Sequence, residues 1–148
     1  MVRGSCLCGQ VSFVIAGPIH ELSNCHCSQC RKAYGTAFGT IAVCSFDTFE
    51  YLTGAELISS YVQSPNVTRH FCQNCGSSLP IKEEGDPLVG IPAGLLDDDP
   101  GIKPSEHIYV ASKAPWWDIT DNKQQHEQSS PGSLLKRAGA PAMGAPSG

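Results

Sequence analysis

Residues 69–79, RHFCQNCGSSL, contain two cysteines that are separated by two residues and followed at once by a glycine. A tight turn in this C-x-x-C-G pattern brings the sulfurs of Cys72 and Cys75 to one side of the chain. Gly76 accepts a positive φ, which lets backbone N–H groups point at the thiolates. Such a turn supplies half of a tetrahedral zinc site. The segment therefore predicts a metal-binding knuckle that leads into a strand.

A second cysteine pair lies near the N-terminus, where Cys6 and Cys8 flank a single residue. Side chains of an extended segment repeat every two residues, so both sulfurs of this C-x-C pair lie on one face. With Cys72 and Cys75 they complete a set of four thiolates, and closed four-cysteine zinc sites are structural. The alternative for these four residues is a disulfide or free thiols. We expect a structural zinc ion that ties the N-terminus to the middle of the chain.

A third group lies in residues 25–30, CHCSQC, and holds Cys25, Cys27 and Cys30. Three protein ligands with an open fourth position are typical of a zinc ion that exchanges water or substrate. A fourth ligand from His26, His70 or Cys44 would instead close the site and make it structural. We expect the ring of His26 to point away from the metal, because this residue lies between two ligands. The difference between three and four cysteines is the strongest functional signal in the sequence.

The composition favours metal binding over disulfides. Eight cysteines stand in a chain of 148 residues whose first ten residues carry no charged-then-apolar export signal. We expect a cytoplasmic protein, since thiols stay reduced there and cysteine-rich chains more often bind metal. A formal net charge of −4 argues against nucleic-acid binding, which needs a basic face. No apolar run approaches the length of about 18 residues that a membrane span requires, so no membrane segment is expected.

Short β-type runs bounded by Gly, Pro, Asn or Asp dominate the first 121 residues. Such runs lie at residues 9–17, 36–44, 57–63, 68–72, 77–82, 88–92 and 107–112. Residues 31–34 suit one helical turn, and residues 23–30 are expected to form a loop. The pattern predicts a mainly β fold with one or two short helices. Residues 122–148 are rich in Gln, Ser, Pro, Gly and Ala, so we expect a disordered tail after one zinc-binding domain at residues 1–121.

Four stretches of the chain resemble one known family. The stretches GSCLCGQVSF, NCHCSQCRKAYGTAF, RHFCQNCGSSL and HIYVASKAPWWDITD are similar to the glutathione-dependent formaldehyde-activating enzyme family, from Arg3 to about Asp121. The resemblance implies several small, coiled antiparallel sheets around zinc sites, a fold shared with methionine sulfoxide reductase B. It also implies two zinc ions. By matching positions, Cys6, Cys8, Cys72 and Cys75 would hold the structural ion, and Cys25, Cys27 and Cys30 the catalytic ion.

The resemblance also implies an activity. Members of the family are named for adding the thiol of glutathione to formaldehyde, which gives S-(hydroxymethyl)glutathione, formally a carbon–sulfur lyase reaction run in reverse. The expected partners are therefore a small thiol, glutathione, and an aldehyde. Glutathione carries two carboxylates, for which Arg31, Lys32 and Arg69 are the candidate partners by their nearness to the cysteines in sequence. The alternative is a non-catalytic zinc module that binds a protein or a thiol ligand, which a closed second zinc site would favour.

Overall fold

The computed structural model of the protein describes residues 1–135. In this range the chain forms eleven short strands and one α-helix, which confirms the mainly β expectation. The strands are β1 (Val2–Ser5), β2 (Ser12–Ile15), β3 (Ile19–Cys25), β4 (Gly39–Ser45), β5 (Phe49–Thr53), β6 (Ile58–Ser64), β7 (Val67–Cys72), β8 (Ser78–Leu79), β9 (Leu88–Pro92), β10 (Glu106–Ile108) and β11 (Gln124–Gln125), and the helix is α1 (Ser28–Tyr34). None of the helices formed by residues 1–135 has the length and apolar character needed to cross a membrane.

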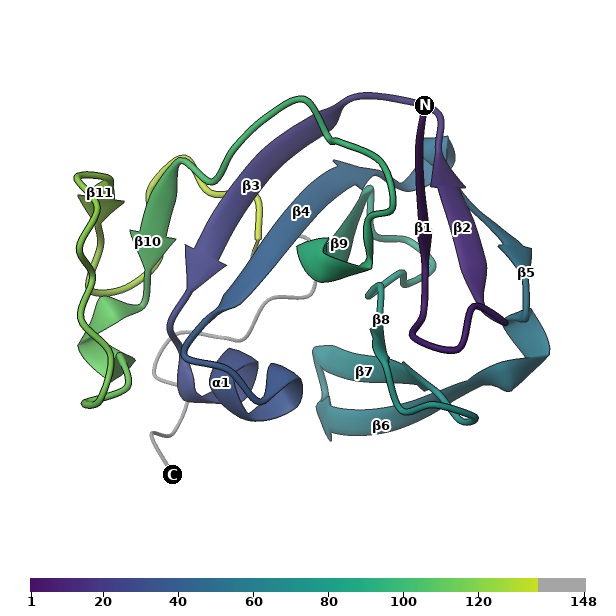
Figure 1. The fold of residues 1–148 in the computed structure, drawn as a ribbon, viewed down its shortest axis with the longest axis horizontal. Helices are drawn as coiled ribbons and strands as arrows, with labels where there is room; N and C mark the ends of the chain where they lie inside the picture. The colour runs from purple at the N-terminus through teal and green to yellow at the C-terminus, as the bar shows by residue number, and fades with distance from the viewer. Residues whose placement is uncertain (136–148) are drawn as a thin grey trace.

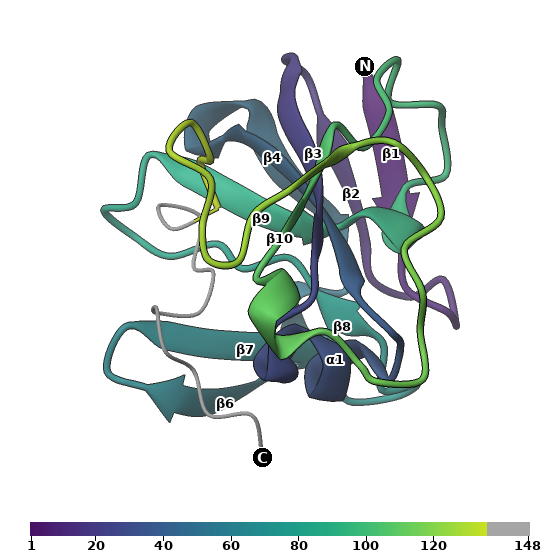
Figure 2. The ribbon, with the colours of Figure 1, turned by 90° about the vertical axis from the view of Figure 1, so that its left-hand side faces the viewer.

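The strands form three small sheets, as expected. The largest has the order β11-β10-β3-β4-β9, and the two others are β1-β2-β5 and β6-β7-β8. In Figure 1 the large sheet crosses the centre, with β1 and β2 to one side and β6 and β7 below it near α1. Most neighbours pair antiparallel, but β10 pairs parallel with both β3 and β11. Figure 2 shows the same sheets from the side on which β10 faces the viewer.

The hydrophobic core follows from the alternating pattern of β2. Phe13 and Ile15 are fully buried, whereas Ser12 and Val14, which alternate with them, are partly exposed. The Phe13 ring stacks on Phe49 of β5 with ring centroids 5.1 Å apart. These residues join buried side chains of β3, β4 and β9 in one cluster. Burial of apolar area in this cluster supplies the main driving force that holds the β1-β2-β5 sheet against the large five-stranded sheet.

The expectation of a loop over residues 23–30 is only partly met, because β3 continues to Cys25 and α1 begins at Ser28. Ser23 and Asn24 are buried in the strand although both are polar. Their side chains are hydrogen-bonded, since Ser23 donates to Glu21 at 2.8 Å and Asn24 accepts from Thr40 at 2.8 Å. Burial of polar groups costs little when partners are present. Only two residues therefore separate the end of β3 from the helix.

Helix α1 is longer than the single turn expected at residues 31–34. It is capped at its N-terminus by Cys27, whose sulfur accepts the backbone N–H of Cys30 at 3.2 Å. At its C-terminus Gly35 adopts a left-handed conformation with φ of 64°, which favours glycine. The helix thus begins and ends at residues that the local sequence defines. Of the third cysteine group, Cys27 caps the helix and Cys30 lies in its first turn.

The segment after residue 121, expected to be a disordered tail, lies against the domain as far as residue 135. Strand β11 pairs with β10, and Leu135 is 2% exposed. The carboxylate of Glu21 accepts the hydroxyl of Ser133 at 2.9 Å and the backbone N–H of Leu134 at 2.6 Å. A few apolar and hydrogen-bonding contacts thus hold a segment whose composition is polar overall. Residues 136–148 of the expected tail lie outside the described range.

Candidate metal centres and the adjoining pocket

The first candidate centre, which we call the four-cysteine cluster, brings together the cysteines of the C-x-C and C-x-x-C motifs. The sulfurs of Cys6, Cys8, Cys72 and Cys75 all lie within 4.8 Å of one another. The first pair lies just after β1, and Cys72 ends β7. Gly76 has the positive φ expected from the sequence, 79°, and its backbone N–H donates to Cys72 O at 2.7 Å. Two turns far apart in the chain therefore face each other with four sulfurs between them.

Hydrogen bonds favour the thiolate form of two members of the four-cysteine cluster, Cys75 and Cys8. The side chain and the backbone N–H of Ser77 lower the pKa of Cys75 to about 5. The side chain of Asn74, followed by the backbone N–H of Gln10, lowers the pKa of Cys8. The backbone N–H of Val11 lies 3.3 Å from the sulfur of Cys6. Four soft sulfur donors surrounded by N–H groups fit a zinc ion in a closed tetrahedral site.

The second candidate centre, the three-cysteine cluster, is built from the end of β3 and the start of α1. The sulfurs of Cys25, Cys27 and Cys30 lie within 4.8 Å of one another, and all three residues are buried. Hydrogen bonds from the thiols of Cys25 and Cys30 lower the pKa of Cys27 to about 3. The hydrogen bonds from the two neighbouring thiols thus favour the thiolate form of Cys27. A buried anionic sulfur cradle of this kind fits a soft divalent cation such as zinc.

None of the side chains proposed as a fourth ligand reaches the three-cysteine cluster. Among residues 1–135, the groups of clustered metal-ligand side chains contain neither Cys44 nor a histidine. Cys44 lies at the far end of β4, because Gly39 of that strand pairs with Cys25 whereas Cys44 pairs with Ile19. His70 of β7 instead contacts Ser60 of the neighbouring strand β6 and Glu83, which follows β8. Within the described chain, the cluster offers three sulfur ligands.

A chain of buried hydrogen bonds, not foreseen from the sequence, holds the loop between Cys25 and Cys27. His26 is fully buried, and its Nε2 lies 2.8 Å from Nδ1 of His107, whose Nε2 lies 2.9 Å from the carboxylate of Asp121. Burial, and then the electrostatic influence of the neighbouring His107, lower the pKa of His26 to about 4. Because a carboxylate only accepts, Asp121 orients the ring of His107, which in turn orients His26. The two histidines are 81 positions apart, so the sequence gives no sign of this contact.

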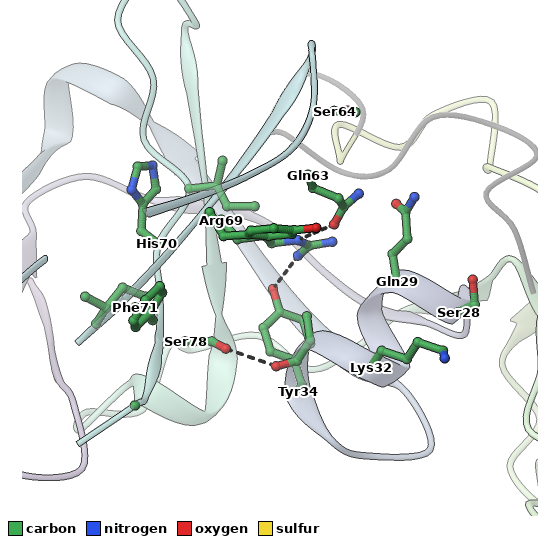
Figure 3. A pocket seen from close by; sticks show the side chains of 15 residues that line it. Ser28, Gln29, Lys32, Tyr34, Gln63, Ser64, Arg69, His70, Phe71 and Ser78 are labelled. Carbon is green, nitrogen blue, oxygen red and sulfur yellow. Dashed lines mark hydrogen bonds between the residues drawn. The ribbon is translucent and has the colours of Figure 1, made fainter. Parts of the chain in front are cut away.

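A pocket of about 800 Å³ opens between α1 and the β6-β7-β8 sheet (Figure 3). Arg69 of β7 dominates its polar part: Nε donates to Gln63 at 2.9 Å, and Nη1 donates to the hydroxyl of Tyr34 at 3.3 Å. Nη2 of Arg69 and the amide nitrogen of Gln63 are buried and have no hydrogen-bond partner among residues 1–135. Two buried N–H donor groups of pocket-lining residues therefore lack an acceptor within the described part of the chain.

The cations expected near the cysteines are divided by the structure. Lys32 and Arg69 line the pocket, whereas Arg31 lies on α1 but is not one of the lining residues. Arg3, which is also near a cysteine in sequence, is exposed and pairs with Asp98 at 2.8 Å. Tyr34 is the last residue of α1, and Cζ of Arg69 lies 5.8 Å from the centre of its ring. The pocket is thus lined by two cationic side chains, Lys32 and Arg69, and borders α1, which carries Cys30 of the three-cysteine cluster.

Comparison with known proteins places the chain in one family. The model of the family described as glutathione-dependent formaldehyde-activating enzyme matches residues 1–112. A curated protein of Halomonas elongata, provisionally named a glutathione-dependent formaldehyde-activating enzyme, is 31% identical over 133 residues, which is 84% of each chain. A solved structure from Rhodobacter sphaeroides is 23% identical and shares the fold with a TM-score of 0.54, over 69% of this chain and 91% of that one. The chain therefore belongs to the glutathione-dependent formaldehyde-activating enzyme family.

Proposed function

We propose that the protein is a zinc-dependent carbon–sulfur lyase that joins the thiol of glutathione to formaldehyde or a related aldehyde. The observation that carries the proposal is the three-cysteine cluster, which is buried, has no fourth ligand among residues 1–135, and lies on the helix that borders a cation-lined pocket. Family membership and the name of the Halomonas relative support the choice of thiol and aldehyde. The four-cysteine cluster would hold a second, structural zinc ion.

The three-cysteine cluster would hold the catalytic ion through its sulfurs. When bound, zinc supplies positive charge that favours the thiolate form of a substrate thiol. In the reaction the sulfur forms a bond to the aldehyde carbon, the carbonyl π bond opens, and the thiol proton ends on the new hydroxyl oxygen. The chain's contribution is positional: β3 and α1 fix the sulfurs, and the His26–His107–Asp121 contacts hold the loop between them. Holding two reactants together replaces an encounter in solution with a reaction inside one complex.

Arg69 and Lys32 would bind the carboxylates of glutathione. Arg69 has a buried Nη2 without a partner among residues 1–135, and the neighbouring amide of Gln63 is in the same condition. The contacts with Gln63 and Tyr34 hold the guanidinium in place, so little side-chain freedom is lost when an anion binds. Lys32 adds a second positive charge on α1, and Arg31, one residue before it, would contribute at longer range.

The decisive experiment combines metal counting with turnover. Native mass spectrometry of the reduced protein should find two zinc ions, and glutathione should bind to one of them or displace it. The same samples should accelerate formation of S-(hydroxymethyl)glutathione above the uncatalysed rate. NMR exchange spectroscopy measures this rate. The Cys27→Ser variant should keep one zinc ion and lose turnover. It should stay folded, since serine is itself a preferred N-cap.

The control is Cys44→Ala, because Cys44 lies outside both clusters. This variant should keep two zinc ions and full turnover. Turnover of Cys27→Ser equal to that of the unchanged protein would rule out the proposed site. If two zinc ions are bound and glutathione neither binds to nor displaces either of them, a non-catalytic zinc module would be favoured instead.

A further inference from the structure

The pocket beside α1 has a second, apolar part that the proposed reactants do not use. Its lining includes the exposed aromatic residues Tyr61 and Phe71, together with the buried residues Leu79 and Ile81. Tyr61 is 62% exposed and Phe71 is 36% exposed, although both are aromatic. Exposed apolar side chains that gather in a concave surface with a polar rim mark ligand-binding grooves. The exposure of these two rings therefore indicates that a ligand with an apolar group binds there.

The strand register explains why apolar and cationic groups share one wall. Tyr61 of β6 pairs directly with Arg69 of β7, so the two side chains lie on the same face of the sheet. Phe71 lies two residues beyond Arg69 on the same strand and thus points to that face as well. Val62, next to Tyr61, alternates to the opposite face and does not line the pocket, although it is 68% exposed. The wall offers an anion-binding centre flanked by aromatic rings.

Neither glutathione nor formaldehyde has a large apolar group that could pack against Tyr61 and Phe71. Formaldehyde has one carbon and one oxygen, and glutathione carries charged groups at both ends. A cavity of about 800 Å³ lies in the upper part of the usual range of small-molecule sites, so it has room for a further apolar group beside glutathione. Charge complementarity with Arg69 and Lys32 still requires an anionic ligand. The occupant must therefore combine carboxylates with a sizeable apolar group.

We propose that the pocket binds adducts of glutathione with apolar aldehydes of several carbons, aromatic ones included, in preference to the formaldehyde adduct. This inference rests on the proposed function, because it assumes glutathione as the thiol. The reaction is unchanged in its balance: sulfur bonds to the aldehyde carbon, the carbonyl π bond opens, and the thiol proton ends on the hydroxyl oxygen. Only the substituent on that carbon differs, and the aromatic wall covers it.

Calorimetric titration of the zinc-loaded full chain with two stable analogues tests the inference. S-methylglutathione stands in for the formaldehyde adduct, and S-benzylglutathione for the adduct of an aromatic aldehyde. We expect the benzyl compound to bind about tenfold more tightly or better, because its ring buries extra apolar area. In Phe71→Ser that preference should shrink to within about threefold, while binding of S-methylglutathione stays the same.

The matched control is Val62→Ser, which removes a more exposed apolar side chain from the same sheet but from the face opposite the pocket. It should preserve the benzyl preference. Circular dichroism and metal counting verify that each variant is folded and holds two zinc ions. Equal affinity for the two analogues would overturn the inference while leaving the proposed function intact. Failure of both analogues and of glutathione itself to bind would overturn both, since no thiol would then be recognised.

Discussion

The two cysteine clusters differ in how they use the chain. The four-cysteine cluster joins segments 64 residues apart, as the contact between Cys8 and Cys72 shows, and Cys8 is exposed. The three-cysteine cluster draws all its sulfurs from six consecutive residues and is buried. A cation in the first cluster closes a long loop, whereas a cation in the second bridges a strand end and a helix start that are already adjacent. If both clusters bind a cation, as proposed, loop length rather than the number of sulfurs would determine which ion contributes more to the stability of the fold.

The largest difference should appear when each cluster loses one ligand. We expect Cys72→Ser to unfold the domain, because metal binding at a structural site contributes about 10–16 kcal/mol, comparable to the whole stability of a small domain. Cys30→Ser should remain folded, since its cluster is local in sequence. Urea unfolding followed by circular dichroism measures both. If the two variants unfold alike, the division into a structural and a catalytic centre is wrong.

The second prediction concerns the apolar cover of the three-cysteine cluster. Leu135 is buried against the cluster together with Ile108 and Tyr109. We expect Leu135→Ala to lower the free energy of unfolding by about 2–5 kcal/mol, as is usual for a buried leucine. A chelator should then remove the metal of the three-cysteine cluster faster, with no change at the four-cysteine cluster. Leu134→Ala is the matched control, because Leu134 is only partly buried and should cost less.

The third prediction addresses the anion-binding part of the pocket. Arg69→Gln should raise the dissociation constant of glutathione roughly 10- to 100-fold, because a hydrogen bond to a charged group contributes about 1.5–3 kcal/mol. Calorimetric titration provides the measurement. Arg3→Gln removes an exposed arginine that is paired with Asp98 and does not line the pocket, so its affinity should stay unchanged. Unchanged affinity of Arg69→Gln for glutathione would show that the carboxylates of glutathione do not bind at Arg69.

The smallest expected effect is a pH dependence centred on Asp121. The hydrogen bond with His107, followed by the backbone N–H of Lys123, lowers the pKa of this carboxyl below its ordinary value of 3.8. A lowered carboxyl pKa stabilises the native state above that value, and the contribution disappears as the pH falls through the lowered pKa. The stability difference between the unchanged protein and Asp121→Asn should therefore shrink as the pH falls below about 5. A constant difference over this range, measured by urea unfolding, would contradict it.

Elements with a regular pattern could be predicted from sequence, and those that depend on distant partners could not. The strand expected at residues 88–92 is β9, and residues 68–72 lie in β7. Strand β3 escaped prediction because His20, Glu21 and Asn24 break its alternation, and Asn24 finds its partner in Thr40 of β4. The strand expected at residues 107–112 ends early, at Ile108, since Tyr109 turns left-handed with φ of 55°.

The same division applies to the candidate site. Local spacing predicted both cysteine groups, and their sulfurs do converge. The choice of a fourth ligand could not be made from spacing, because only the pairing of β3 with β4 places Cys44 away from Cys25. The contact of His26 with His107 and the burial of Leu135 likewise depend on where β10 and the segment after it pack. Ligand motifs are local in sequence, whereas the surroundings that tune them are assembled by the fold.

Cys27 has two structural roles, and their combination bears on the kinetics of metal exchange. Its sulfur belongs to the three-cysteine cluster and also accepts the backbone N–H of Cys30 that begins α1. This hydrogen bond is present without an ion, so the start of α1 and the placement of Cys30 do not depend on metal binding. An ion that binds at the three-cysteine cluster, as proposed, would therefore enter a preformed site and need no folding step first.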